Sequence, residues 1–164
     1  MYNPLGYKAL RTFQQATEIY ELTKKFCADH LNPVVDRRLI DHMISSGRSG
    51  KQNIAEGHGR NSTKANIEFL GFSIGSLNEL LEDYFDLEKD YKEGLRKTKK
   101  DKEMALATIS QAIKLLMGEL TMLKRQREGL EKKYIAEGDE REKLISRHDQ
   151  ERKKKILRSY NWRW

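Results

Sequence analysis

Apolar and small residues recur at steps of three or four positions from Tyr7 to His30, which is the spacing of one face of an α-helix. The stripe consists of Ala9, Phe13, Ala16, Tyr20, Thr23 and Cys27. Asn32 and Pro33 follow it, and proline lacks a backbone donor and disfavours helical geometry at the residue before it. The pattern therefore predicts a first helix that ends at this dipeptide.

A second helix is expected to begin near Asp36, because aspartate is a favoured N-cap residue. Its apolar face carries Ile40, Met43, Ile44, Gly47 and Ile54. Residues 45–50 contain only serine, glycine and arginine, and each glycine in a helix costs about 1 kcal/mol relative to alanine. We therefore expect another part of the molecule to approach this backbone closely.

Two further helices complete the pattern. Glycines at 57 and 59 end the second helix, and Asn61 or Ser62 can cap a third helix, whose apolar residues are Leu70, Ile74, Leu77, Leu81 and Phe85. A connection at residues 92–100 leads to a fourth helix, with near-heptad apolar spacing from Ile109 to Tyr134 and a stop at Gly138. Since no strand signal occurs, the sequence predicts an all-α, up-down four-helix bundle over residues 1–137.

Residues 138–164 are predicted to form a basic, aromatic extension that follows the bundle. Asp139 and Glu142 resemble a capping box and predict the start of a fifth, more polar helical segment. The most apolar stretch of the chain, residues 105–123, lies before this extension and is interrupted by Lys114 and Glu119. It therefore predicts an amphipathic helix and not a membrane span, and we expect no membrane partner.

Charge is distributed unevenly along the chain. The 164 residues include 32 Lys and Arg and 25 Asp and Glu, for a net charge of +7. Residues 1–123 hold 18 basic and 17 acidic residues, whereas residues 124–164 hold 14 and 8. A local acidic patch comprises Glu79, Glu82, Asp83, Asp86, Glu88, Asp90 and Glu93. Separate acidic and basic surfaces favour oriented association, with other copies of the chain or with a partner.

Residue types that carry catalysis are present but not grouped. The four histidines are scattered, and Cys27 with His30 has no second ligand pair that would complete a metal site. The Glu-x-x-His pairs of diiron bundles do not occur, and Ser62 replaces the last glycine of a dinucleotide-binding loop at residues 57–62. We therefore expect no enzymatic activity, no metal and no cofactor. A single cysteine cannot form an internal disulfide, which fits a cytoplasmic location.

Basic residues of the second helix form one candidate binding surface. Arg37 and Arg48 are eleven positions apart, about 20° on a helical wheel, and Lys51 lies within about 60° of both. Such a row beside small residues can bind phosphate through side-chain charge and backbone donors together. Simple exposure to solvent is the alternative for each of them.

The C-terminal segment forms a second candidate surface, because it mixes cations with aromatic rings as single-stranded or looped nucleic acid requires. The candidate residues are Lys153, Lys154, Lys155, Arg158, Trp162, Arg163 and Trp164. Contact with an anionic membrane, contact with another protein, and a disordered solubilising tail are the alternatives.

The stretch from Arg48 to Arg60, followed by Gly75–Leu81, resembles the four-helix-bundle family of large-subunit ribosomal-RNA intervening-sequence proteins. This family includes the accessory variability determinant of diversity-generating retroelements. The core of the resemblance is Asn-Ile-Ala-Glu-Gly-x-Gly-Arg at residues 53–60, and the similarity extends over residues 7–123. The extension that follows is similar to that of a subgroup with a C-terminal suffix.

The resemblance implies a protein without catalysis of its own, a homopentamer, and binding of template RNA and of a reverse transcriptase. It also implies that Arg48, Lys51 and Arg60 face nucleic acid or the lumen of the pentamer. Asn53, Glu56, Gly57 and Gly59 would support the junction of the second and third helices. We therefore expect a cytoplasmic accessory protein that holds template RNA, or the cDNA copied from it, for a reverse transcriptase. The alternative is a structural protein–protein adapter without a dedicated nucleic-acid role.

Overall fold

The computed structural model describes residues 6–96 and 101–160, and almost all of them are helical. The elements are a short 3-10 helix at Gly6–Ala9, followed by α1 (Arg11–His30), α2 (Arg37–Gly59), α3 (Thr63–Lys92), α4 (Lys102–Glu137) and α5 (Glu140–Tyr160). No strand occurs within these described ranges. The predicted all-α class is confirmed.

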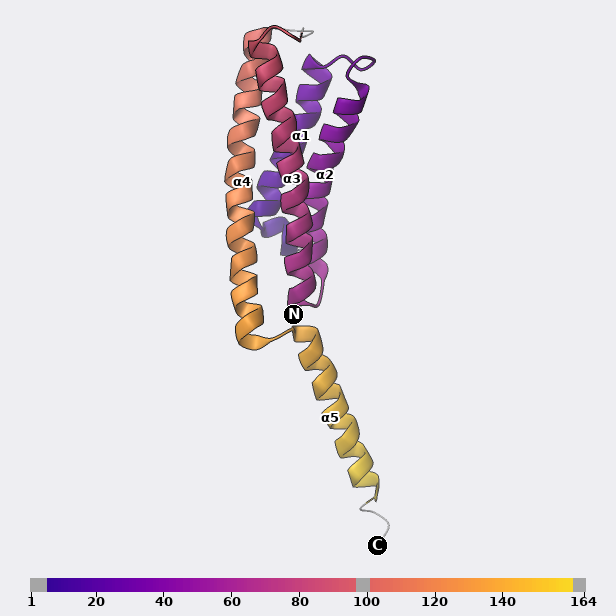
Figure 1. The fold of residues 1–164 in the computed structure, drawn as a ribbon. Coiled ribbons are helices and arrows are strands. Elements are labelled where there is room, and N and C mark those ends of the chain that lie inside the picture. Colours follow the sequence, from indigo (N-terminus) through magenta and orange to yellow (C-terminus); the bar gives the residue numbers. More distant parts are fainter. Residues whose placement is uncertain (1–5, 97–100, 161–164) are drawn as a thin grey trace.

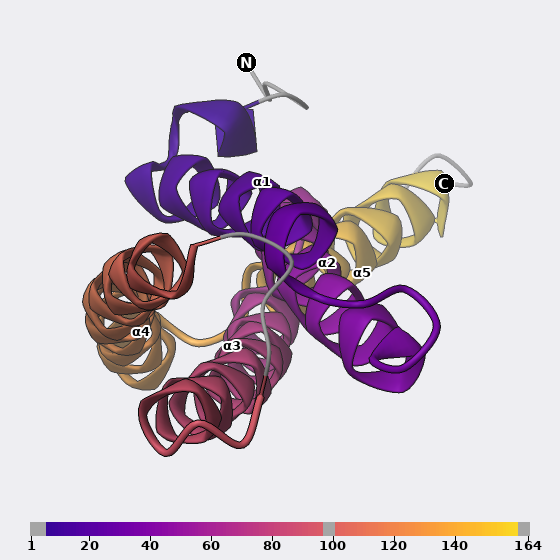
Figure 2. The same ribbon diagram turned by 90° about the horizontal axis from the view of Figure 1, so that it is seen from above.

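Helices α1 to α4 run alternately up and down and form a four-helix bundle (Figure 1). Seen along its length, the bundle places each helix beside the next one in sequence, and α4 closes the circle against α1 (Figure 2). Helices α1 and α3 therefore face each other diagonally. Helix α5 does not join the bundle but continues away from the end where α4 finishes (Figure 1).

The start of α1 differs from the sequence-based expectation, whereas α2 starts where expected but without the expected side-chain cap. Helix α1 begins after Leu10, which is extended (φ −69°, ψ 127°), so the segment around Tyr7 forms a separate turn. Asp36 stands at the N-cap of α2, but its carboxylate does not cap the helix. It accepts hydrogen bonds from the Asn32 amide (2.8 Å) and from Arg96, and so ties the α1–α2 loop to the chain beyond α3.

The buried stripe of α1 is displaced from the predicted one. Ala16, Thr23 and Cys27 are buried as expected, but Ile19 and Phe26 complete the stripe. Two of the predicted residues, Phe13 and Tyr20, lie at its half-buried edges. In α3 the predicted Phe85 is 39% exposed, whereas Leu80, Tyr84 and Leu87 are buried.

Polar side chains connect the helices through the core. The Tyr84 hydroxyl of α3 donates to Thr23 Oγ1 of α1 at 3.0 Å, across the diagonal of the bundle. Ser73 Oγ of α3 donates to the carbonyl oxygen of Gly50 in α2 at 2.8 Å. A buried polar group without a hydrogen-bond partner lowers the free energy of unfolding. A paired buried hydroxyl costs little free energy and favours the one packing arrangement in which its partner is in reach.

The small residues of α2 allow α3 to approach closely, as the sequence predicts. A Cβ atom added at Gly50 would lie 2.5 Å from Leu77 Cδ2, and one added at Gly57 would lie 2.9 Å from Phe69 Cβ. At Gly47 the Cβ would make ordinary contacts at 3.5 Å. Close approach at Gly50 and Gly57 therefore fixes the spacing of α2 and α3.

Glu119 of α4 is fully buried, and neither of its carboxyl oxygens has a hydrogen-bond partner. Burial raises the pKa of this carboxyl to about 8. The side chain is therefore mostly protonated at neutral pH, where an exposed glutamate would be ionised. Glu119 occupies a position of the buried stripe of α4 between Leu116 and Leu123.

By length and composition alone, part of α4 is apolar enough to cross a membrane. A third of that stretch is buried inside the protein. The buried residues of α4 face the bundle, and they include Ala105, Ile109, Ala112, Leu116 and Leu123. The core therefore accounts for part of the apolar character of α4, whereas Met104 and Met117 are exposed.

A short junction fixes where α5 leaves the bundle. Gly138 has a left-handed backbone (φ 74°) and closes α4 with a hydrogen bond from its amide to the Tyr134 carbonyl oxygen (2.8 Å). The next residue, Asp139, is only 4% exposed. Its carboxylate accepts hydrogen bonds from Ser62 Oγ (2.8 Å) and from the Lys64 amide (3.0 Å), at the start of α3.

Glu140 continues this attachment. Its carboxylate accepts hydrogen bonds from Thr63 Oγ1 and from Lys133 Nζ, the latter at 2.5 Å. The Lys133 ammonium and the Thr63 hydroxyl lower the pKa of Glu140 to about 2, and the Lys64 amide together with Ser62 lowers the pKa of Asp139. We call Asp139, Glu140 and their partners on α3 and α4 the α5 junction.

Substituting Gly50 tests the α2–α3 spacing. Gly50→Ala is expected to destabilise the bundle by about 1–2 kcal/mol, because the methyl group must displace Leu77 and this outweighs the gain in helix propensity. The control is Gly75→Ala, whose added Cβ meets nothing within 4 Å and which should stabilise by about 0.5–1 kcal/mol. Urea unfolding followed by circular dichroism measures both, and equal effects of the two substitutions would refute the close approach.

Glu119 is expected to make stability depend on pH. Its pKa in the folded state is raised, so its favourable contribution is complete below the pKa of an exposed glutamate, about 4.3, and is lost progressively as pH rises toward 8. Glu119→Gln should remove this part of the decline in the free energy of unfolding. In urea unfolding, the variant should therefore gain stability relative to the wild type between pH 5 and pH 8. Parallel stability profiles of wild type and variant would show that the carboxyl is not buried.

The α5 junction is expected to open in acid. Both carboxylates have lowered pKa values, so their contribution is present above about pH 4 and is lost as pH falls toward 2. At neutral pH, Asp139→Ala should speed hydrogen exchange of the Lys64 amide by about fivefold or more, because a lost cap of this kind costs about 1 kcal/mol or more. The exposed Asp149→Ala is the control and should leave that amide unchanged.

Candidate nucleic-acid interface

The three predicted cations of α2, Arg37, Arg48 and Lys51, differ in exposure and in the groups that lie beside them. Arg37 lies 3.9 Å from Asp41 and is 81% exposed. Arg48 is exposed, and no ion pair joins it to any described residue. About 16 Å of helix separates the two arginines along the axis, since they are eleven residues apart. The row therefore consists of spaced single charges along α2.

Lys51 contacts an aromatic side chain that the sequence assigned only to the core. Its Nζ lies 4.7 Å from the centre of the Tyr20 ring, and Lys24 Nζ lies 4.7 Å from the same ring. Lys24 also pairs with Glu21 at 2.7 Å. Tyr20 thus holds two ammonium groups at the α1–α2 surface through cation–π contacts. The spacing of Tyr20 on the helix did not reveal this role, because Lys51 comes from another helix.

The motif at residues 53–60 builds the turn between α2 and α3. Gly57 is buried where α3 approaches, and the Arg60 amide donates to the Gly57 carbonyl oxygen (3.2 Å) to end the helix. Gly59 is the last residue of α2 and is exposed. Asn53 is half-buried in the helix before the turn. Gly57 is therefore a packing residue of the turn, and the supporting role that the resemblance implied for Asn53, Glu56 and Gly59 stays a prediction.

Arg60 is not an unpaired cation. Its guanidinium donates to Glu56 at 2.5 Å, one helical turn back, and stacks over the Phe69 ring at 4.9 Å. Both groups of the pair are about half exposed. Polyanion binding at Arg60 would therefore compete with a surface ion pair, which is worth about 1 kcal/mol or less.

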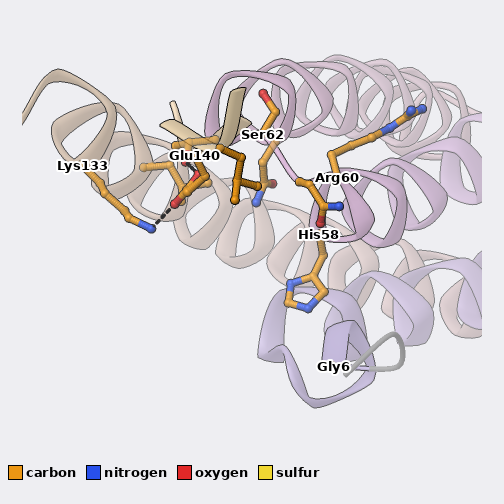
Figure 3. A pocket seen from close by; sticks show the side chains of 11 residues that line it. Gly6, His58, Arg60, Ser62, Lys133 and Glu140 are labelled. Carbon is orange, nitrogen blue, oxygen red and sulfur yellow. Dashed lines mark hydrogen bonds and ion pairs between the residues drawn. The ribbon is translucent and has the colours of Figure 1, made fainter. Parts of the chain in front are cut away.

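A pocket of about 520 Å³ lies between this turn and the α5 junction. His58, Arg60 and Lys133 line it, together with Ser62 and Glu140 (Figure 3). The Lys133 ammonium points to Glu140, whereas the Arg60 guanidinium points away from that pair (Figure 3). The positive groups therefore do not converge on one point in the pocket.

The amino end of α3, which borders this pocket, is already occupied. Its first amides are a potential anion site because they carry the positive end of the helix dipole. The Lys64 amide donates to Asp139 and the Ala65 amide donates to Ser62 Oγ at 3.1 Å, which confirms Ser62 as the cap. A phosphate at this position would have to displace the carboxylate of Asp139.

Helix α5 carries the densest positive charge among the described residues. Arg152, Lys153, Lys154, Lys155 and Arg158 are exposed. No acidic residue lies between positions 152 and 158, and no ion pair joins these five cations to another part of the described chain. Helix α5 projects from the bundle (Figure 1). At about 100° per residue, these exposed charges are distributed around the helix. The predicted residues Trp162, Arg163 and Trp164 lie outside the described residues.

Groups suited to catalysis do not come together in the described ranges. There, no three or more His, Cys, Asp or Glu side chains lie close enough to hold a metal ion. Cys27 is buried, and burial raises the pKa of its thiol to about 12, so the thiolate needed for nucleophilic chemistry is not formed.

Comparison with known proteins identifies the family. No curated protein matches the chain. A family model described as 23S rRNA-intervening sequence protein matches residues 9–115, which covers α1, α2, α3 and the first part of α4. The match includes the α2–α3 turn and stops before Glu119 and α5. The four-helix bundle, the turn motif and this match together show that the chain belongs to the 23S rRNA-intervening sequence protein family.

Proposed function

We propose that the protein is a non-enzymatic accessory protein that binds RNA, with α5 as the principal contact. The observation that carries this proposal is the run of five exposed cations at positions 152–158, which no acidic group of the described chain neutralises. Membership of an rRNA-associated family is compatible with a polyanionic partner. Binding by phosphate neutralisation releases counterions, so affinity should fall steeply with salt.

The bundle would supply a second, weaker contact. Arg48 is exposed, and Lys51 is held beside it on the Tyr20 ring. Holding a lysine on a ring reduces its freedom and so lowers the entropy lost when the ammonium contacts phosphate. Arg37 and Arg60 each have a carboxylate nearby and are expected to contribute less.

A finer proposal follows from the resemblance of residues 53–60. In it the protein holds template RNA, or the cDNA copied from it, for the reverse transcriptase of a diversity-generating retroelement. It would act in the cytoplasm as a homopentamer. A long basic arm on every subunit would give such an assembly several points of attachment to one nucleic acid, and linked contacts raise avidity without new chemistry.

The alternative function, a protein–protein adapter, is favoured by one observation. Glu82 and Asp86 of α3 and Glu93 at its C-cap are exposed, and no ion pair joins them to described residues. An adapter would use these carboxylates to dock a basic partner. Charge reversal there would then abolish partner binding without reducing RNA retention.

RNA binding is tested by filter retention of a structured RNA over a salt series. Lys153→Ala/Lys154→Ala/Lys155→Ala is expected to weaken binding at least about tenfold and to reduce the slope of log affinity against log salt by about 2–3, since each lost phosphate contact removes just under one counterion. Arg48→Ala/Lys51→Ala should have a smaller effect in the same direction.

The matched control removes three exposed lysines from separate helices, in Lys25→Ala/Lys89→Ala/Lys132→Ala. It has the same net charge as the α5 variant and should bind within about threefold of the wild type. Salt-independent binding by the wild type, or equal losses in both triple variants, would contradict a dedicated site on α5.

A further inference from the structure

Helix α5 has a long surface that nothing in the described protein covers. Within the described ranges its ion pairs to the bundle end at Lys143, which lies 3.9 Å from Glu137. Beyond that point Leu144 and Ile145 are more than half exposed, although both are large apolar residues. A 21-residue helix without tertiary contacts is only marginally stable, so a packing partner would be needed to hold it in place.

The positive charges of α5 include a straight stripe. Arg147, Lys154 and Arg158 lie within about 40° of one another on the helical wheel, at about 100° per residue. Their separations along the chain are seven and then four residues. All three are exposed. We call them the basic stripe.

Helix α3 carries a stripe of opposite charge with the same spacing in reverse. Glu82, Asp86 and Glu93 are separated by four and then seven residues and also lie within about 40° of one another. They are the members of the acidic patch that have no described ion pair, whereas Asp83 pairs with His42 (2.7 Å) and Asp90 with Arg96 (3.4 Å). We call these three residues the acidic stripe.

The two stripes match when the helices are antiparallel. Arg147 then meets Glu93, Lys154 meets Asp86, and Arg158 meets Glu82, and both stripes extend about 16 Å. Beside the acidic stripe lies a groove of about 490 Å³, which is lined by the carboxylates of Asp83, Asp86 and Asp90, by the cations Lys89 and Arg96, and by Leu39 and Leu87. This groove can accept an aliphatic stem of lysine or arginine together with its charged end.

One chain cannot make this contact with itself. The acidic stripe lies on the C-terminal half of α3, at the end of the bundle where α3 finishes, whereas α5 starts from the opposite end and points away (Figure 1). The α5 junction holds the start of α5 in that position through Asp139 and Glu140. The complement of α5 must therefore come from another molecule.

We propose that α5 docks antiparallel on the acidic stripe of α3 in a second copy of this chain. The contact combines three ion pairs in register with burial of stems in the groove, and it runs along one face of α5 from Arg147 to Arg158. It does not require RNA. Because Lys154 and Arg158 belong both to the RNA-binding run and to the basic stripe, RNA binding and docking compete for α5.

Disulfide trapping tests the contact directly, and independently of any other interface between copies. An Asp86→Cys protein mixed with a Lys154→Cys protein, both full-length and treated with nuclease, should form a cross-linked dimer under mild oxidation. Lys153→Cys, one residue away and on another side of α5, is the control and should cross-link at least about tenfold less. Cys27 is buried and does not interfere. Equal cross-linking at positions 153 and 154 would overturn the proposed register.

Charge exchange provides the second arm. Two variants each reverse the charge of one stripe: Glu82→Lys/Asp86→Lys/Glu93→Lys and Arg147→Glu/Lys154→Glu/Arg158→Glu. Each alone should weaken self-association through α5 by at least about tenfold in sedimentation at low salt. Mixing the two variants should restore the association. Arg141→Glu/Arg152→Glu/Lys153→Glu makes the same change in net charge off the stripe and should retain association within about threefold. Failure of the mixture to recover association would refute the proposal.

The same variants separate docking from RNA binding. The acidic-stripe variant should bind RNA at least as well as the wild type, since it loses only the competitor for α5. If the basic-stripe variant loses RNA but keeps its self-association, the docking proposal fails and the proposed function stands. If it loses self-association but keeps RNA, the proposed role of α5 in RNA binding fails and docking stands.

Discussion

The close approach of α2 and α3 is the constraint on which the arrangement depends. Gly50 and Gly57 leave no room for a side chain, and Ser73 uses the proximity to reach a carbonyl oxygen of α2. With this pair fixed, the turn at residues 60–62 presents the amino end of α3 at one end of the bundle. Asp139 attaches there, so the position from which α5 emerges follows from the packing of two earlier helices.

Much of the fold could be predicted because it depends on local patterns. The end of α2, the Ser62 cap and the Gly138 stop are set by residues within a few positions of each helix end, where side chains and backbone compete directly for hydrogen bonds. The buried stripe of α1 was displaced because two overlapping seven-residue repeats share Ala16 and Thr23. Only packing against the other helices selects the repeat that includes Ile19 and Phe26.

The candidate interface was less accessible to prediction because contacts between helices have no sequence signature. The resemblance pointed to Arg60, whose guanidinium lies over the Phe69 ring of α3. Its pair with Glu56, four residues back, has a spacing that the sequence does show. Tyr20 looked like a core residue, yet its ring supports lysines from two helices. In contrast, the charge of α5 could be recognised at once, since a run of cations without acids needs no knowledge of the fold.

The placement of α5 and of the acidic stripe at opposite ends has a consequence for assembly. Any contact between them is heterologous, because the two partners offer different surfaces. Repeated from copy to copy, such a contact closes into a ring when its rotation divides a full circle and otherwise grows into an open filament. In the proposed docking, the direction in which α5 leaves the bundle enters that rotation, and it depends on the positive φ of Gly138 and on the contacts of Asp139 and Glu140. The α5 junction would thus bear on the choice between a closed particle and an endless polymer.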